Sequence, residues 1–196
     1  FLRGWKPKPG SESERIQKQF LGWDANVSAG SETALIYEFW MERLESKLVP
    51  AAAGARAAPS VVLRELARNA KSSALLSESL EEALAGIRER LGNDPKDWQW
   101  GAIHKVYFPH PSGHQSWNLP AVSRPGDGYT VNATSGAHFL QQNGASYRQI
   151  IDVSNWDRSV MTNVPGESGV PGNPHYGDLV DGWANGHYHP IPFTRA

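Results

Sequence analysis

The stretch "YRQIIDVSNWDRSVMTNVP" (147–165) carries the clearest β-strand pattern of the chain. Its first half alternates, and the residues that share one side of the predicted strand are Tyr147, Gln149, Ile151 and Val153. A period of two residues is typical of a half-buried strand. "WDR" (156–158) then supplies a turn, and "SVMTNVP" (159–165) returns as a second strand. We therefore predict a β-hairpin over 147–165.

The stretch that follows, "PGESGVPGNPHYGDLVDGW" (165–183), is dense in Gly and Pro, which predicts turns. Asn173 in an N-cap position and Pro174 at the first helical position then predict a helix, which Gly186 ends. The residues expected to face inward from this helix are Tyr176, Leu179, Val180 and Trp183, and those expected on its solvated face are Asp178 and Asp181. The tail "HYHPIPF" (187–193) is predicted to be extended, and its prolines exclude a central strand.

Upstream, the first half of the chain has helical periodicity. Ser11 and Glu14 form a capping-box pattern before a predicted helix over 12–22. Ser31 is expected to cap a second helix, whose inward stripe contains Ile36, Trp40, Leu44 and Leu48. That helix is expected to end where the low-complexity stretch "PAAAGARAAPS" (50–60) begins, which predicts a surface loop.

Two further helices are predicted over 60–71 and 78–91. The inward face of the first is expected to contain Leu63, Leu66, Ala67 and Ala70. Ser79 with Glu82 forms a second capping-box pattern, and Gly92 stands where a helix commonly ends. These apolar stripes are expected to be core faces.

The chain therefore divides into a mainly helical segment, 1–96, and a strand and loop segment, 97–196, which together predict an α+β fold. With 196 residues the chain is long enough for one domain, or for two small ones. The net charge of −1, from 19 basic and 20 acidic residues, lacks the clustered positive charge of nucleic-acid-binding proteins. No 18-residue apolar segment is present, so no membrane span is expected.

Familiar catalytic and metal-binding patterns are missing from the sequence. Without cysteine, thiolate metal sites and a cysteine nucleophile are excluded, and the seven histidines lack the spacing of zinc motifs. Ser168 does not stand in a G-x-S-x-G nucleophile elbow. "GDG" (126–128) precedes a strand-like segment, which argues against a phosphate-binding loop. Trp98 and Trp100 could stack on a sugar or a peptide, although core packing is the more common role of such a pair.

Beyond these patterns, the segment "SYRQIIDVSNWDRSVMTNVPGESGVPGNPHYGDLVDGWANGHYHPIPFTR" (146–195) resembles the C-terminal end of the penicillin acylase family, which are N-terminal-nucleophile amidohydrolases. The other pieces that resemble the family occur in its order: "WDAN" (23–26) with "ALIYEFWMERL", "DWQWGAIHKVYFPHP" (97–111) and "PGDGYTVNAT" (125–134). "VPGESG" (164–169) stands where the family commonly has P-G-Q-S-G. The resemblance covers nearly the whole chain and is weakest over 50–80.

This resemblance implies hydrolysis of linear amides, such as β-lactam side chains, acyl-homoserine lactones or lipopeptide acyl chains. In the family, self-cleavage exposes a Ser whose hydroxyl attacks the amide carbonyl while its own α-amine acts as the base. Backbone N–H groups and an Asn side chain bind the oxyanion. Residue 1 here is Phe, and the family's nucleophile, oxyanion Asn and Arg are all expected upstream. We therefore assign no catalytic residue to this chain.

Four residues remain as structural or pocket candidates. His104 and Asn132 belong to two of the family-like elements. Glu167 and His175 lie in the Gly- and Pro-rich stretch, where turn formation requires neither. Glu167 also replaces the family's Gln with a charged group.

The resemblance also implies the wider setting. The chain is expected to be the C-terminal portion of an αββα sandwich, with 147–165 supplying strands and the helices forming part of a flanking layer. Its start, "FLRGWKPKPG", has neither an initiator Met nor an apolar signal core, so we expect a fragment or a processed product. The expected partners are the remainder of the acylase, namely the small chain and the upstream part of the large chain, and an acyl amide substrate.

No cofactor is expected in this chain, although the resemblance allows calcium in the full-length protein. The family implies a periplasmic or secreted location. Residues 1–196 alone are expected to be inactive, and poorly soluble or dimeric. Two alternatives stay open: a stand-alone binding or scaffold module, and a degenerate acylase without activity.

Overall fold

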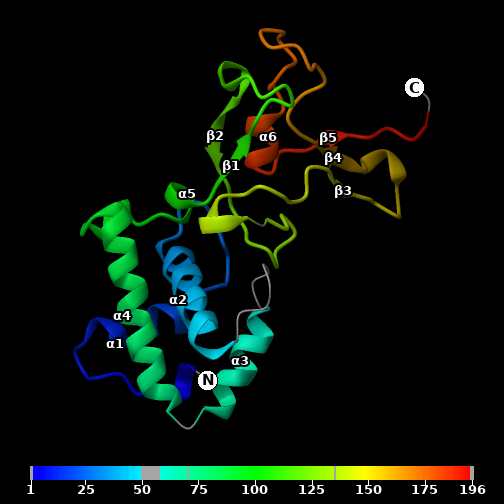
Figure 1. The fold of residues 1–196 in the computed structure, drawn as a ribbon. Helices are drawn as coiled ribbons and strands as arrows, with labels where there is room; N and C mark the ends of the chain where they lie inside the picture. The colour runs from blue at the N-terminus through cyan, green and yellow to red at the C-terminus, as the bar shows by residue number, and fades with distance from the viewer. Residues whose placement is uncertain (1, 50–57, 70, 135, 195–196) are drawn as a thin grey trace. The chain divides into compact units, whose positions relative to one another are not determined.

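The structure is a computed structural model that describes residues 2–49, 58–69, 71–134 and 136–194. The chain forms two compact units: Phe1–Asn26 with Gly30–Trp100, and Val27–Ala29 with Gly101–Ala196. The first unit is helical and the second contains two small sheets, which confirms the α+β prediction (Figure 1). Within the described residues, no helix is both long enough and apolar enough to cross a membrane. The predicted loop over 50–60 lies largely outside the described residues.

The first two helices begin where their capping residues predict. Helix α1 spans Glu12–Leu21 and α2 spans Glu32–Leu48. The Ser11 and Ser31 hydroxyls accept the backbone N–H three residues later, at 3.3 and 3.0 Å, and so satisfy donors that a helix start leaves free. One contact differs from the capping box: the Glu14 carboxylate accepts the N–H of Gly10 rather than that of Ser11.

The predictions for the next two helices need correction. Helix α4 spans Ser72–Leu91, so Ser79 is not its cap. The Ser79 hydroxyl instead donates to the Leu75 carbonyl one turn earlier, as helix-interior serines do. Helix α3 spans Pro59–Arg68 and buries Val62 and Leu66, whereas Leu63 is 43% exposed. The inward face of α3 is therefore rotated from the predicted one.

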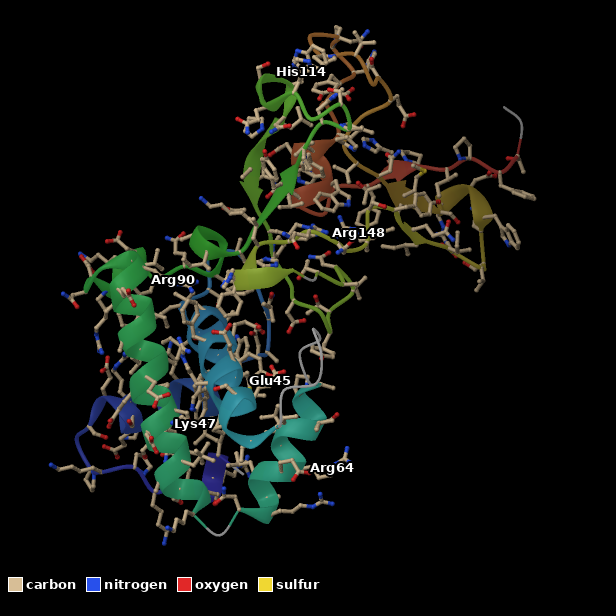
Figure 2. All side chains as sticks on the ribbon, viewed as in Figure 1. Glu45, Lys47, Arg64, Arg90, His114 and Arg148 are labelled. Atoms are coloured by element: carbon tan, nitrogen blue, oxygen red, sulfur yellow. The ribbon has the colours of Figure 1, made fainter. Side chains whose placement is uncertain are left out.

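Helices α2 and α4 form the centre of the first unit and lie side by side (Figure 1). The buried residues of α4 include the predicted stripe residues Leu80, Leu84 and Ile87. Phe20 stacks on Trp40 with ring centroids 5.4 Å apart. Lys47 of α2 reaches Glu78 and Glu82 of α4, at 3.0 and 2.8 Å (Figure 2). Trp98 and Trp100 are both about 1% exposed, so they pack in the core rather than presenting a stacking surface.

The second unit contains the predicted hairpin, with shorter strands. Strand β3 (Arg148–Ile150) pairs antiparallel with β4 (Val160–Thr162), and β5 (His189–Pro190) joins the free edge of β4. β3 ends early because the Asp152 carboxylate accepts the N–H groups of Ser154 and Asn155, which turns the chain. The second sheet pairs β1 (Lys105–Phe108) with β2 (Leu119–Ser123).

The helix predicted from Pro174 begins later than expected. Helix α6 spans Val180–Ala184, and residues 173–179 form turns in which Asn173 accepts the N–H of His175 at 2.8 Å. Gly177 packs against β2, where an added Cβ would lie 2.8 Å from a Leu119 methyl group. This tertiary contact and the Asn173 turn replace the predicted first turns. Gly186 follows α6 with φ of 75°, which favours glycine.

The remaining short elements are α5 (Trp100–Ile103) and five 3₁₀ turns, at Leu2–Gly4, Pro95–Asp97, Gln115–Trp117, Ala137–Phe139 and Trp156–Arg158. The last of these confirms the turn predicted at "WDR".

Candidate functional site

Trp183 of α6 is the centre of the second unit's core. It is about 1% exposed, and its indole N–H donates to the Ala145 carbonyl at 3.1 Å. The apolar residues that pack with it are Val106 and Ala184, with Phe108, Val122 and Val164 at the margin. β1, β2 and α6 therefore meet around one indole ring.

Two arginines lie over this ring. The Arg124 guanidinium carbon is 3.6 Å from the ring centroid, and that of Arg148 is 5.7 Å away. Arg124 Nη1 donates to the carbonyls of Trp183 and Ala184, at 3.2 and 3.4 Å, and Arg148 Nη2 donates to the Trp183 carbonyl. Figure 2 shows Arg148 beside α6. We call Arg124 and Arg148 the arginine pair; both bind the C-terminal carbonyls of α6, where the helix is partially negative.

The pKa of each arginine in the pair is lower than that of an ordinary arginine. The Arg124 side chain is fully buried, and burial, helped by the neighbouring charge of Arg148, lowers the pKa of Arg124 to about 10. Burial also lowers the pKa of Arg148. Three buried nitrogens of the pair, Arg124 Nε and Nη2 and Arg148 Nε, have no hydrogen-bond partner among the described residues.

His104 and Asn132 both lie against the segment that carries Arg124. The ring of His104 is buried, and its Nδ1 lies 2.6 Å from the Arg124 carbonyl, which requires the proton on Nδ1. Burial, with a smaller effect from the positive charge of Arg124, lowers the pKa of His104. Asn132 donates to the Pro125 carbonyl at 2.8 Å and accepts from Arg148. These two candidates therefore support the arginine pair.

Glu167 and His175 lie in the 165–179 loop, and the hydrogen bonds of their side chains are formed locally. Glu167 is exposed and accepts from Asn163 at 3.0 Å. His175 is exposed and contacts Asp178 at 2.8 Å. Because Asp178 precedes α6, it does not share a helix face with Asp181 as predicted. The sequence candidates thus form two separate groups.

A cavity of about 220 Å³ opens beside Trp183. Val106, Phe108 and Val164 give it apolar walls, and Gln141 lines it as well. The Gln141 side-chain oxygen is buried without a hydrogen-bond partner among the described residues. The apolar walls could therefore accept a small apolar group, whereas the Gln141 oxygen has almost no accessible surface and cannot be reached from the cavity.

For metals, the described part of the chain brings no three His, Asp or Glu side chains together in a way that could hold an ion. His114 lies against Trp117, with ring centroids 4.3 Å apart.

Sequence reasoning missed Arg124, Arg148 and Gln141. Arg124 immediately precedes the family-like element "PGDGYTVNAT", and Arg148 lies inside the predicted hairpin strand. Arg148 within a strand-like segment was the one indication that the sequence offered. Its partner, Trp183, is 35 residues further along the chain, so the sequence pattern did not connect the two.

Comparison with known proteins places the sequence of this chain in a family. The sequence model of the family described as penicillin amidase matches residues 3–196. An acyl-homoserine lactone acylase, QuiP, of Pseudomonas fluorescens is 26% identical over 212 residues, covering 93% of this chain and 26% of that protein. A penicillin acylase 2 proenzyme of a Pseudomonas species is 31% identical over 199 residues, covering 88% of this chain and 26% of that protein.

Among solved structures, a thermostable penicillin G acylase from Alcaligenes faecalis overlays on 96% of this chain and 41% of its own. The TM-score is 0.48 and the sequence identity 15%, so nothing about the site rests on this overlay. The chain spans about a quarter of the length of the curated relatives it matches. Because the family match covers nearly every residue, the chain belongs to the penicillin amidase family.

Proposed function

We propose that this chain is the C-terminal part of an amidohydrolase that cleaves linear N-acyl amides. The observation that carries the proposal is the match of about nine-tenths of the chain to two acylases, each of which is about four times longer than the matched region. The candidate substrates are β-lactam side chains, acyl-homoserine lactones and lipopeptide acyl chains. The whole protein is proposed to work in the periplasm or outside the cell.

The proposed chemistry takes place outside these 196 residues. A Ser at the start of the processed large chain attacks the amide carbonyl, and its α-amine takes the hydroxyl proton. The acyl-enzyme forms as the amine leaves, and water then releases the carboxylic acid. Calcium in the full-length protein stays a prediction.

The role proposed for this chain is architectural. Segments 1–96 and 97–196 are proposed to be parts of one incomplete domain, and the β3–β4 hairpin to contribute strands to an αββα sandwich. The exposed apolar residues of the hairpin region, among them Ile150 and Val153, support this, because a sheet face without a cover favours association. His104 and Asn132 would hold the arginine pair, and Glu167 and His175 would order the 165–179 loop.

The test is an amide-hydrolysis assay on the complete protein. Phenylacetyl and long-chain acyl amides are incubated with it, and the released amine and acid are quantified. The proposal predicts equimolar release from at least one substrate class. A correctly processed complete protein that hydrolyses neither class would contradict it, and would favour the degenerate acylase.

The cavity beside Trp183 supports a second candidate, a stand-alone binding module. Its lining combines the apolar residues Val106, Phe108 and Val164 with the polar residues Gln142, Asn143 and Ser146, which suits a small amphipathic ligand. Isothermal titration of residues 1–196 with acyl amides or sugars tests this function. Micromolar binding would favour it, and heats equal to dilution would reject it.

A further inference from the structure

The second unit contains two Asn-Gly dipeptides, at Asn143–Gly144 and Asn185–Gly186. In such a dipeptide the backbone nitrogen of the glycine can attack the side-chain amide carbon of the asparagine, because glycine has no Cβ to obstruct the approach. Asparagine belongs to the thermolabile residues. The two dipeptides are chemically identical, so a difference in their reactivity must come from the structure around them.

Packing requires a glycine at position 144. A Cβ on this residue would lie 2.5 Å from Gln141 Nε2 and 2.8 Å from the Ala133 carbonyl oxygen, distances at which side-chain carbons are not found. Gln141 is itself buried, which limits its room to move aside. The backbone nitrogen that follows Asn143 is therefore unhindered as a consequence of the fold.

The two asparagine side chains differ in how they are held. Asn143 is exposed at the lining of the cavity beside Trp183, and its side chain forms no hydrogen bond with the described residues. Asn185 Nδ2, in contrast, donates to the backbone carbonyl and to the carboxylate of Asp181, both at 2.9 Å. The Gly186 N–H also donates, to the Trp183 carbonyl at 3.4 Å. Attack at Asn185 must first break these contacts, whereas the Asn143 amide can rotate toward Gly144.

We propose that Asn143 is a site of spontaneous deamidation. The Gly144 nitrogen bonds to Asn143 Cγ, the bond from Cγ to Nδ2 breaks, and the Gly144 amide proton leaves with Nδ2 as ammonia. Water then opens the cyclic imide at either of its carbonyls, which gives aspartate or isoaspartate at position 143. Water is the only co-reactant, and no step involves the amide hydrolysis proposed above.

The modification would change the cavity beside Trp183. None of the residues that line this cavity in the described part of the chain is charged, so either product introduces a carboxylate into a neutral lining. Isoaspartate also adds a methylene group to the backbone between Gln141, which pairs with Val106, and strand β3. Because a charge disfavours apolar surroundings, the cavity should become less suited to an apolar group as the protein ages.

Peptide mass spectrometry of the complete protein tests the proposal. The native protein is incubated in mildly alkaline buffer made with heavy-oxygen water, and the two Asn-Gly peptides are followed over time. Asn143 is expected to deamidate at least about tenfold faster than Asn185, because the hydrogen bonds of Asn185 must break first. The product at position 143 should contain one heavy oxygen and include isoaspartate. Its rate should rise with pH, because the attacking nitrogen must lose its proton.

Two variants and an unfolded sample serve as controls. In denaturant the two dipeptides should react at similar rates, since only the fold distinguishes them. Asn143→Gln should remove the reaction at position 143 and leave the rate at Asn185 unchanged. Asp181→Ala removes one acceptor of the Asn185 amide and should accelerate the reaction there.

Three results would overturn the proposal. The first is native Asn185 reacting as fast as Asn143 or faster. The second is a native Asn143 that stays intact while the same residue reacts in denaturant, which would show that the complete protein protects it. The third is a product that contains aspartate without isoaspartate, because direct hydrolysis by water forms no imide. All three are independent of whether the complete protein hydrolyses N-acyl amides.

Discussion

At the scale of single residues, His104 is the clearest case in which burial changes chemistry. Its ring is buried against the Arg124 carbonyl, and its pKa is lowered from the ordinary value of 6.5. Between the lowered pKa and 6.5, the unfolded chain therefore binds more protons at this residue than the folded chain does. The contribution of neutral His104 to the free energy of unfolding is therefore complete above pH 6.5 and is lost as the pH falls from 6.5 through the lowered pKa.

We therefore predict that the melting temperature of the His104→Asn variant depends less on pH than that of the wild type. The expected result is a smaller drop in the complete protein's melting temperature between pH 7 and 5 than in the wild type. His114→Asn, at an exposed position, is the control and should keep the wild-type slope. Identical slopes for all three proteins would show that His104 does not titrate in this window.

Glu167 is the residue-scale departure from the family pattern. Its carboxylate is exposed and has one side-chain partner, Asn163, so a neutral amide of the same shape can keep that contact. We predict that Glu167→Gln changes the free energy of unfolding by less than about 0.5 kcal/mol. Chemical denaturation of the complete protein measures this change. A decrease of several kcal/mol in the free energy of unfolding would mean that the Glu167 carboxylate has a second partner besides Asn163.

At the scale of elements, helix boundaries that depend on neighbouring residues could be predicted from the sequence. Features that depend on contacts between residues far apart in the sequence could not. Ser11 and Ser31 fix the starts of α1 and α2 because a cap acts within three residues. The start of α6 depends on Gly177 packing against Leu119, and the arginine pair depends on an indole contributed by α6. Neither contact leaves a periodic pattern in the sequence, so the predicted helix start at Pro174 was wrong and the arginines were not identified.

Helix α3 gives an element-scale prediction with a built-in control. Leu66 is fully buried and Leu63 is 43% exposed, although both belong to the face predicted to be inward. Leu66→Ala is expected to cost about 2–5 kcal/mol, because it removes buried apolar contacts and leaves a cavity. Leu63→Ala should cost less than about 1 kcal/mol, and denaturant unfolding of the complete protein compares them. Equal costs would mean that Leu63 and Leu66 are buried to a similar extent, which would contradict the orientation of α3.

At the scale of the whole molecule, several large hydrophobic side chains of the second unit are exposed. The large hydrophobic residues at least half exposed there are Tyr129, Val131, Ile150, Val153, Trp156, Val170 and Phe193. We predict that residues 1–196 expressed alone associate or precipitate, because such exposed groups favour contacts with other chains. Light scattering and calorimetry measure this, and a monodisperse monomer with a cooperative melt would be the opposite outcome.

We propose that these residues are one part of a larger amide hydrolase. The most direct measurement is the rate of amine release from an N-acyl amide by three samples: the complete protein, the same protein without residues 1–196, and residues 1–196 alone. We expect turnover only in the complete protein. Turnover by residues 1–196 alone, or unchanged turnover after their removal, would contradict it.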